Sequence, residues 1–445
     1  MTFFIKIKFL FILVVIWSNL FSNQIAFNNY GDDLSLRNNE EFREFITQAV
    51  INQPDFKEII AMKSKYNFDY RVSRADRFPT ISSSIINENY FDRKISEVDS
   101  IRKIQDDSLD AIVEINQQLY AGNRINNKIL NAKRQIEIGN LELEERTSEL
   151  LLKANQIYFD TFKFYVIKKY LNDQAIKLEK LLEMADKRLQ AGISQPAERA
   201  LLQIKYNELL ITRANINSEI ISSRETYFRF FDEEFALEMV PTVLLANLDT
   251  NNNLLNDKNI NSLSYGVQIS NIVFDQSKTE INIVKGEYRP EFGLNVKYIQ
   301  YDFDRDFDEF DVRGGIYFQM PIFDFGRRGN KINSARANSS QLKWENQSEK
   351  RDFLIEKKSL EGKLVALNLM LEELKNTQIN TRKQQRILSQ RMTGSEYNSV
   401  ALADVIVQDI NLFVEVLDTE INLYLADLQL SHVKTELLSR FRLAL

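Results

Sequence analysis

Short segments that alternate apolar and polar residues recur four times along the chain. A period of two over about ten residues is typical of a β-strand with one apolar face. In the last segment Val312, Ile316 and Phe318 fall on one face, and Arg313 falls on the other. The four segments are residues 81–90, 111–119, 292–298 and 311–320.

The remainder of the pattern predicts helices, two of them very long. Residues 123–190 carry apolar side chains at helical spacing among many charges, and contain no Pro. At 1.5 Å per residue this helix would be about 100 Å long. It must pack laterally along its length, as a coiled coil or a helical tube. Further helices are expected at 39–78, 196–231, 263–289 and 401–444, with a second long one between Gly326 and Gly394.

Three landmarks recur in the same order in the two halves of the chain. A Pro closes a helix and opens a strand, a Gly turn joins a strand to a long helix, and a Gly ends that helix. The paired positions are Pro79 and Pro290, Gly122 and Gly326, and Gly192 and Gly394. This order predicts an internal duplication of a unit with helix, strand, strand, helix and helix. The repeats would cover 25–240 and 263–445, joined by a linker at 241–262.

The N-terminus predicts export. Lys6 and Lys8 precede an unbroken apolar run at 9–17, followed by small and polar residues. This is typical of a secretory signal peptide, here residues 1–24, and the run is short for a transmembrane anchor. No later apolar run is long enough to span a bilayer, so entry into a membrane after export would require a β-barrel.

Four strands cannot close a barrel, since the smallest bacterial barrels have eight. An outer-membrane interpretation therefore requires an oligomer, and three copies would supply twelve strands. A pair of soluble hairpins is the alternative for the same strands. The signal peptide and four strands of matched length favour the membrane interpretation.

Composition argues against an enzyme and against nucleic-acid binding. The chain has no Cys and one His, His432, so it cannot build a thiolate site, a His-based triad or a multi-His metal site. We expect no catalytic residue, metal or cofactor. The net charge of −6 gives no basis for nucleic-acid binding. The acidic segment 301–311 lacks the Gly and the final Glu of a calcium loop, so a solvated loop between strands is expected.

Together these features resemble the TolC family of efflux and secretion channels. The resemblance runs from about Phe42 to the C-terminus and rests on the order and twofold recurrence of its motifs. They are Asn52-Gln53-Pro54, the two Arg-x-Pro or Arg-Pro helix ends, Ile322-Phe323-Asp324-Phe325-Gly326-Arg327, and Arg188 with Gly192-x-Ser194.

The resemblance implies a mainly helical fold with membrane β-structure. A homotrimer would form one twelve-stranded outer-membrane β-barrel, continuous with a long periplasmic helical barrel. The implied partners are outer-membrane lipid, a periplasmic adaptor protein and an inner-membrane pump. The implied function is a passive exit duct of a tripartite efflux pump or of type I secretion, and the choice of small compounds or polypeptides as cargo stays open.

The resemblance also implies two functional regions. A gate would include an acidic ring beyond the second hairpin tip, where Asp404 matches the first acid and Val407 replaces the second; Asp409 is a possible substitute. Asp404 could equally be an acid that stabilises a helix N-terminus. The adaptor-contacting hairpin tips would include Arg188, Gly192, Ser194 and Gly394. The same glycines could merely end helices, and Ser194 could cap the next one.

A secreted coiled-coil structural or adhesive protein is the rival interpretation. It accounts for the export signal and the helices, but not for the paired strands or for the Pro and Gly landmarks.

Overall fold

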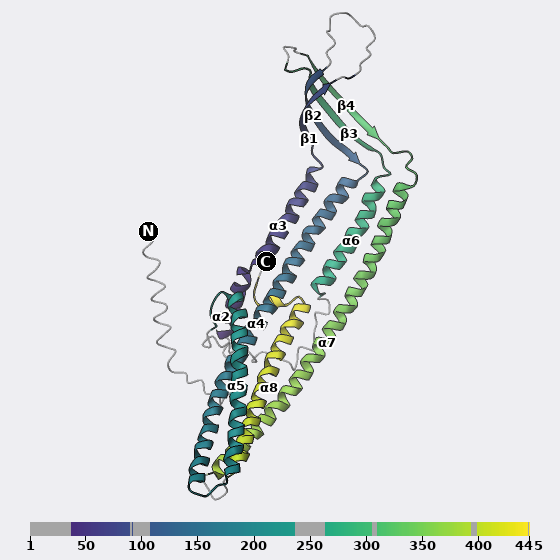
Figure 1. The fold of residues 1–445 in the computed structure, drawn as a ribbon. Helices are drawn as coiled ribbons and strands as arrows, with labels where there is room; N and C mark the ends of the chain where they lie inside the picture. Colours follow the sequence, from purple (N-terminus) through teal and green to yellow (C-terminus); the bar gives the residue numbers. More distant parts are fainter. Residues whose placement is uncertain are drawn as a thin grey trace, which may run out of the picture.

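The computed structural model describes residues 37–89, 91, 107–235, 263–304, 309–392, 398–443 and 445 (Figure 1). The predicted signal peptide, the linker at 241–262 and Gly394 lie outside these residues. The helices are α2 (Arg37–Asn52), α3 (Pro54–Ala75), α4 (Arg124–Gln190), α5 (Pro196–Phe231), α6 (Tyr265–Gly286), α7 (Arg327–Arg391), α8 (Ser399–Val433) and α9 (Leu437–Arg440). The strands are β1 (Thr80–Asn89), β2 (Asp107–Ala121), β3 (Glu291–Gln300) and β4 (Phe310–Gln319).

The molecule is a long curved layer of helices with a β-sheet at one end and two helical hairpins at the other (Figure 1). The 67 residues of α4 and the 65 residues of α7 run the length of the helical part. Helices α5 and α8 fold back along them from the hairpin tips, while α3 and α6 lie beside them next to the sheet. The prediction of two very long helices and two returning ones is confirmed.

The sheet is antiparallel, with the strand order β1-β2-β3-β4. Its central pair, β2 and β3, joins the two repeats, and a β-bulge shifts the register between Gln118 and Tyr120. In the described part of the chain, β1 and β4 are each paired along one edge only. The sheet of the single chain is therefore open on both sides.

The two repeats have matching spacings between their strands and helices. Thr80 faces Asn116 in the first hairpin, and Glu291 faces Gln319 in the second. The distance along the chain from Thr80 back to the end of α3 at Ala75 equals that from Glu291 back to the end of α6 at Gly286. Likewise, the distance from Asn116 on to the start of α4 at Arg124 equals that from Gln319 on to the start of α7 at Arg327. The same count pairs Gly122 with Phe325, whereas the sequence motifs suggested Gly326. The turns nevertheless share their conformation, because each has two successive residues with positive φ.

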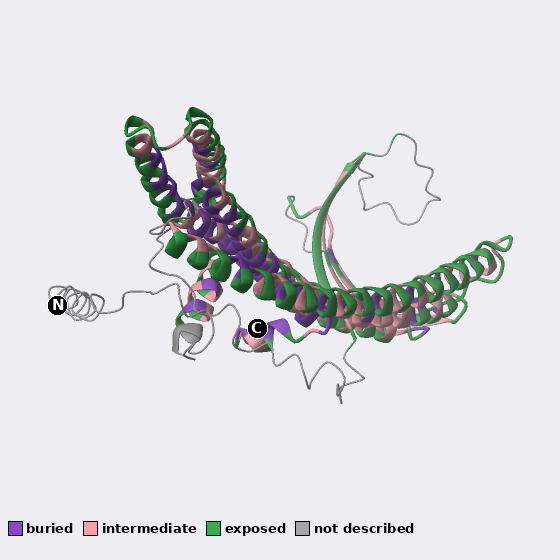
Figure 2. Cartoon of the chain, turned by 90° about the horizontal axis from the view of Figure 1, so that it is seen from below, coloured by how far each residue is buried: buried purple, intermediate pink, exposed green. Residues whose placement is uncertain are grey.

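The core lies in the lower half, where the two hairpins pack against each other. An aromatic cluster surrounds Tyr158, whose ring contacts Phe42, Phe159, Tyr227 and Phe231. Burial is concentrated on the facing sides of the hairpins, whereas the edge strands β1 and β4 and much of the outer surface of the helices stay exposed (Figure 2). Helix α8 is the most buried of these elements, because it contacts α4, α5 and α7.

Helix α7 buries only a narrow seam. Its buried residues recur mostly at intervals of seven or eleven positions, first against α6 and then against α8, which is the spacing of a coiled-coil contact on one side. The rest of its surface is exposed and carries large apolar side chains. These are Trp344, Leu354, Ile355, Val365, Leu369, Met370, Ile379 and Ile387.

Two expectations about helix bounds were wrong. The predicted helix at 39–78 is broken at Gln53, because Pro54 cannot donate to the preceding turn and starts α3 instead. The predicted helix at 401–444 ends at Val433, after which Thr435 has a positive φ. The chain then forms the short helix α9, which places Phe441 in the buried core.

We expect Phe159→Ala to destabilise the helical part strongly. Phe159 is fully buried among aromatic rings, and truncation of such a side chain costs about 3–5 kcal/mol. Phe228→Ala on α5 is the matched control, because Phe228 is largely exposed. Thermal unfolding followed by circular dichroism should show a much larger fall in melting temperature for Phe159→Ala. Equal shifts would contradict the position of the core.

Candidate functional site

The sheet has one apolar and one polar face. Paired residues on the apolar face form rows across all four strands, such as Ile81, Ile115, Val296 and Gly314. Tyr120 and Phe292 continue this face toward the helices, with their rings stacked 5.2 Å apart. Many of these side chains are solvent-exposed in the single chain. An apolar sheet face without cover is typical of a surface that meets lipid or another protein.

The opposite face carries charged and amide side chains. Lys297 on β3 lies 3.3 Å from the carboxylate of Glu114 on β2, which also accepts a hydrogen bond from Asn295. Arg313 on β4 pairs with Asp311 at 2.6 Å. Asp311 also accepts a hydrogen bond from the Tyr301 hydroxyl, so the part of the acidic segment that the structure describes is tied to the strands. The predicted alternation is confirmed along most of the strands, but the β-bulge between Gln118 and Tyr120 places Tyr120 opposite Phe292 on the apolar face, where strict alternation predicted Leu119.

The four predicted junction residues lie where strands and helices meet. Pro79 directly precedes β1, and Pro290 directly precedes β3. Gly122 and Gly326 both adopt left-handed backbone conformations, with φ of 63° and 80°, just before the long helices. Gly122 also lies so close to the carbonyl of Gly286 that a Cβ would not fit. This close approach holds α4 against α6 below the sheet.

Gly192 ends α4 at the tip of the first hairpin. It has φ of 69°, and the amide of the next residue, Ile193, donates to the carbonyl of Arg188 over 2.9 Å. This hydrogen bond closes a Schellman motif, which favours glycine at the left-handed position. A Cβ at Gly192 would meet no atom within 4 Å, so the requirement for glycine is conformational.

Ser194 does not cap the returning helix, so the alternative in which it would is wrong. The N-cap of α5 is Gln195, and Pro196 occupies the first helical position. The Ser194 hydroxyl is buried and has no hydrogen-bond partner among the described residues. The tip is held instead by Arg199, whose guanidinium lies 2.9 Å from the carboxylate of Asp186 on α4.

Asp404 lies near the second hairpin tip and faces the first hairpin. Helix α8 begins at Ser399, so Asp404 lies beyond the first turn, where the helix dipole has little effect. Its side chain is 55% exposed and lies 3.3 Å from Lys205 on α5. This hydrogen bond raises the pKa of Lys205, which stays charged. Ser399 strengthens the same contact between hairpins, since its hydroxyl donates to Glu198 on α5.

Asp409 is buried and lies among three helices. Its carboxylate is 2% exposed and accepts hydrogen bonds from the Tyr170 hydroxyl on α4 and from Arg382 Nε on α7, the latter over 3.3 Å. The Tyr170 ring stacks on Phe413 at 3.8 Å. In the single chain, therefore, Asp409 is not exposed as the predicted substitute gate acid would be.

Further acids along α8 each pair with a base from a neighbouring helix. Glu420 lies 2.8 Å from Lys375 on α7, and Asp418 lies 3.2 Å from Lys163 on α4. The carboxyl of Glu420 is buried, and this burial raises its pKa. Together with Asp404 and Asp409, these pairs connect α8 to α4, α5 and α7. The sequence analysis singled out Asp404 and Asp409 but neither Asp418 nor Glu420, and it predicted none of the partners, because the pairs join residues distant in the chain.

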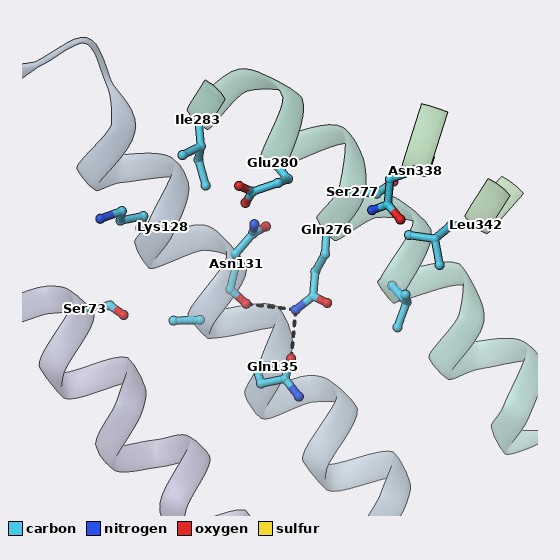
Figure 3. A pocket seen from close by; sticks show the side chains of 12 residues that line it. Ser73, Lys128, Asn131, Gln135, Gln276, Ser277, Glu280, Ile283, Asn338 and Leu342 are labelled. Carbon is cyan, nitrogen blue, oxygen red and sulfur yellow. Dashed lines mark hydrogen bonds between the residues drawn. The ribbon is translucent and has the colours of Figure 1, made fainter. Parts of the chain in front are cut away.

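A groove of about 520 Å³, lined by both polar and apolar side chains, follows the contact between α4 and α6 (Figure 3). Gln276 on α6 spans the contact, and its amide donates to the Asn131 carbonyl over 3.1 Å and to Gln135 over 3.2 Å. Lys128 on α4 and Asn338 on α7 also line it. The groove marks the boundary between the two repeats.

The described residues hold no metal centre: nowhere in those ranges do three His, Cys, Asp or Glu side chains come together in a geometry for an ion. His432 is half-buried, with Nδ1 2.7 Å from the Ser148 hydroxyl, and burial lowers its imidazole pKa. Of the helices described, none is both long enough and apolar enough to cross a membrane.

Solved structures with the same arrangement are outer-membrane proteins. The outer-membrane protein VceC of Vibrio cholerae aligns with 90% of this chain and 97% of its own, with a TM-score of 0.74 and 12% identity. The chain has the fold of this protein and of outer-membrane channels. The CmeC channel of Campylobacter jejuni aligns with 92% of this chain and 89% of its own, with a TM-score of 0.73 and 11% identity.

The MtrE channel of Neisseria gonorrhoeae, in its open state, aligns with 89% of both chains, with a TM-score of 0.66 and 12% identity. No family model and no curated protein matches the sequence, so the likeness is one of structure. At the level of the fold, the resemblance that the sequence motifs indicated is confirmed.

We expect Tyr170→Phe to destabilise the junction of the three helices. The change keeps the stacked ring but leaves the buried Asp409 carboxylate without one donor, at a cost of about 1–3 kcal/mol. Tyr206→Phe on α5 is the control, because Tyr206 packs against the core without being fully buried. Thermal unfolding should show a lower melting temperature for Tyr170→Phe than for Tyr206→Phe. The buried hydrogen bond would be contradicted if both variants unfolded at the wild-type temperature.

Proposed function

We propose that the chain is an outer-membrane exit duct of the TolC family, assembled as a homotrimer. The observation that carries this proposal is the open sheet, with an apolar face, a charged face and two free edges, standing on helices about 100 Å long. Three copies would supply twelve strands, and the apolar face would meet lipid while the charged face lines a water-filled pore.

The helical part supports a hollow periplasmic tube. The narrow seam of α7 leaves its other side exposed, and α3 and α5 are likewise exposed at the opposite edge of the layer. A helix of this length needs lateral partners, which further copies would provide. The alternative of a secreted coiled-coil protein does not account for the exposed apolar face of the sheet or for its unpaired edge strands.

In this proposal the duct is passive. An inner-membrane pump supplies energy, and a periplasmic adaptor binds the hairpin tips that contain Arg188, Gly192, Ser194 and Gly394. Opening moves the tips outward as adaptor binding shifts the population of conformations. Small compounds and polypeptides are both compatible with a water-filled path, so the system is an efflux pump or a type I secretion system.

Asp404 is the residue that we propose for the gate. It lies near the tip with an exposed carboxylate, and three copies around a narrow axis would attract cations. Lys205 of the same chain offsets part of this charge. Asp409 would join the ring only if its contacts with Tyr170 and Arg382 opened.

Purified protein in planar bilayers tests the duct and the gate together. We expect stable single-channel conductance for the wild type and a weaker block by multivalent cations for Asp404→Asn, because the ring of charges is lost. Asp418→Asn is the control, since Asp418 is a half-exposed acid of α8 that pairs with Lys163 away from the tip. Absence of any conductance would contradict the duct. Unchanged cation block in Asp404→Asn would contradict only the gate.

A further inference from the structure

We propose that the groove of Figure 3 is a weak binding site, in the wall of the duct, for small zwitterionic compounds that carry an apolar portion. The proposal rests on the proposed function and adds a class of cargo to it. Because helices of a single chain form the whole groove, each copy would carry one complete site.

The groove opens on the side of the helical layer that continues the polar face of the sheet. Gln118 on that face of β2 donates to the carboxylate of Glu291 over 3.0 Å, and Glu291 also pairs with Arg124 at the start of α4. Lys128 and Asn131 follow Arg124 by four and seven residues and therefore share its face of α4. The polar face lines the water-filled path in the proposed duct, so the groove opens to the same path.

Two acceptors lie together in the groove without a donor. The Oδ1 atom of Asn131 is buried and has no hydrogen-bond partner among the described residues. Figure 3 shows its side chain pointing toward Glu280 on α6, which is exposed and forms no ion pair within the part of the chain that the structure describes. A buried acceptor without a partner has a free-energy cost that a bound donor removes. A carboxylate beside such an acceptor suits an ammonium group, which has three N–H donors.

Lys128 supplies the opposite charge. It lies one helical turn from Asn131 toward the sheet, is exposed, and likewise has no ion-pair partner in the described ranges. Its ammonium is carried on a flexible four-carbon chain, so it can reach a ligand carboxylate at several positions. Lys128 would repel a lone cation and Glu280 a lone anion, so together they favour a molecule that has both charges.

Apolar side chains complete the walls of the groove and come from three helices. They are Ala132 on α4, Val273 and Ile283 on α6, and Leu342 on α7. The volume of about 520 Å³ lies within the range of sites for drug-sized ligands, roughly 300–1,000 Å³. The features of the groove therefore fit a small amphipathic zwitterion.

The groove combines a fixed floor with an open side. Gln276 on α6 donates to Gln135 on α4 over 3.2 Å, which holds the two helices together before a ligand arrives. The open side makes binding weak and reversible. This suits a conducting path, whose sites must attract cargo and also release it.

Three fluorescent probes that differ by one charged group test the class of ligand. Nε-dansyl-lysine is a zwitterion, dansylcadaverine lacks its carboxylate, and N-dansyl-aminohexanoate lacks its α-ammonium. Fluorescence polarisation with the purified full-length assembly, corrected for protein-free micelles, should show the tightest binding for Nε-dansyl-lysine. Equal affinities for the three probes, or no saturable binding of any of them, would overturn the proposed ligand class.

Two single substitutions assign the charges. Lys128→Gln should weaken binding of Nε-dansyl-lysine about two- to fivefold, as expected for one solvent-accessible ion pair, and should not weaken binding of dansylcadaverine. Glu280→Gln should weaken binding of Nε-dansyl-lysine to a similar extent and should not weaken binding of N-dansyl-aminohexanoate. A variant that weakened all three probes alike would contradict the role given to its residue.

Lys133→Gln and Glu137→Gln are the matched controls. Both residues are exposed, and they follow Arg124 by nine and thirteen residues, which places them on the far side of α4 from the groove. Both variants should keep the affinities of the unmodified protein. A loss as large as that of the groove variants would show that the probes respond to the net charge of the protein, and the groove would be excluded as their site.

Asn131→Leu separates binding from stability. The change keeps the size of the side chain and removes a buried acceptor that has no partner, so the melting temperature should not fall. Binding of the two probes that carry an ammonium should weaken. A purely structural role for Asn131 would give the reverse result, with a lower melting temperature and unchanged binding.

Single cysteines test the side on which the groove opens, because the chain has no Cys of its own. A bulky methanethiosulfonate reagent should lower the single-channel conductance of Lys128→Cys and leave that of Lys133→Cys unchanged. The opposite pattern, or conduction by a protein that binds none of the probes, would overturn this inference and leave the proposed duct standing. Absence of conductance in every variant would contradict the duct and, with it, the role of the groove in the passage of cargo.

Discussion

Unpaired backbone at the two edges of the sheet is the constraint on which the rest of this structure depends. An edge strand exposes a row of N–H and C=O groups that bind any available strand, and in lipid each unpaired group is costly. Here the strands at both edges also carry exposed apolar side chains on one face. Closure with further copies satisfies the edges and the apolar face at the same time.

The long helix α7 also leaves apolar surface uncovered in the single chain. α7 buries a single seam on one side, and its remaining surface exposes large apolar residues along about 100 Å. α8, in contrast, packs against α4, α5 and α7 and is fixed by ion pairs to each of them. The chain thus combines a self-contained hairpin core with edges that the proposed assembly would cover.

Local signals in the sequence were sufficient to predict most of the elements. Period-two alternation identified all four strands, and the residues Pro79, Pro290, Gly122 and Gly192 mark element ends, because their effects on backbone conformation are local. The end of α8 and the buried position of Phe441 were missed, since an amphipathic tail has no local signal that distinguishes a continued helix from a turn.

The candidate site was predictable only in part, because its contacts join distant segments. The acids Asp404 and Asp409 could be found by their place after the tip, but only the packing of three helices separates an exposed acid from a buried one. Lys205, Tyr170 and Arg382, which decide this difference, carry no mark in the sequence.

The most direct test of the assembly is detergent extraction of outer membranes, followed by electrophoresis of heated and unheated samples. The account predicts a band near three times the 52.1 kDa chain mass that persists without heating and collapses to one chain on heating. Recovery of the protein only as a soluble monomer with the same mobility in both samples would contradict it.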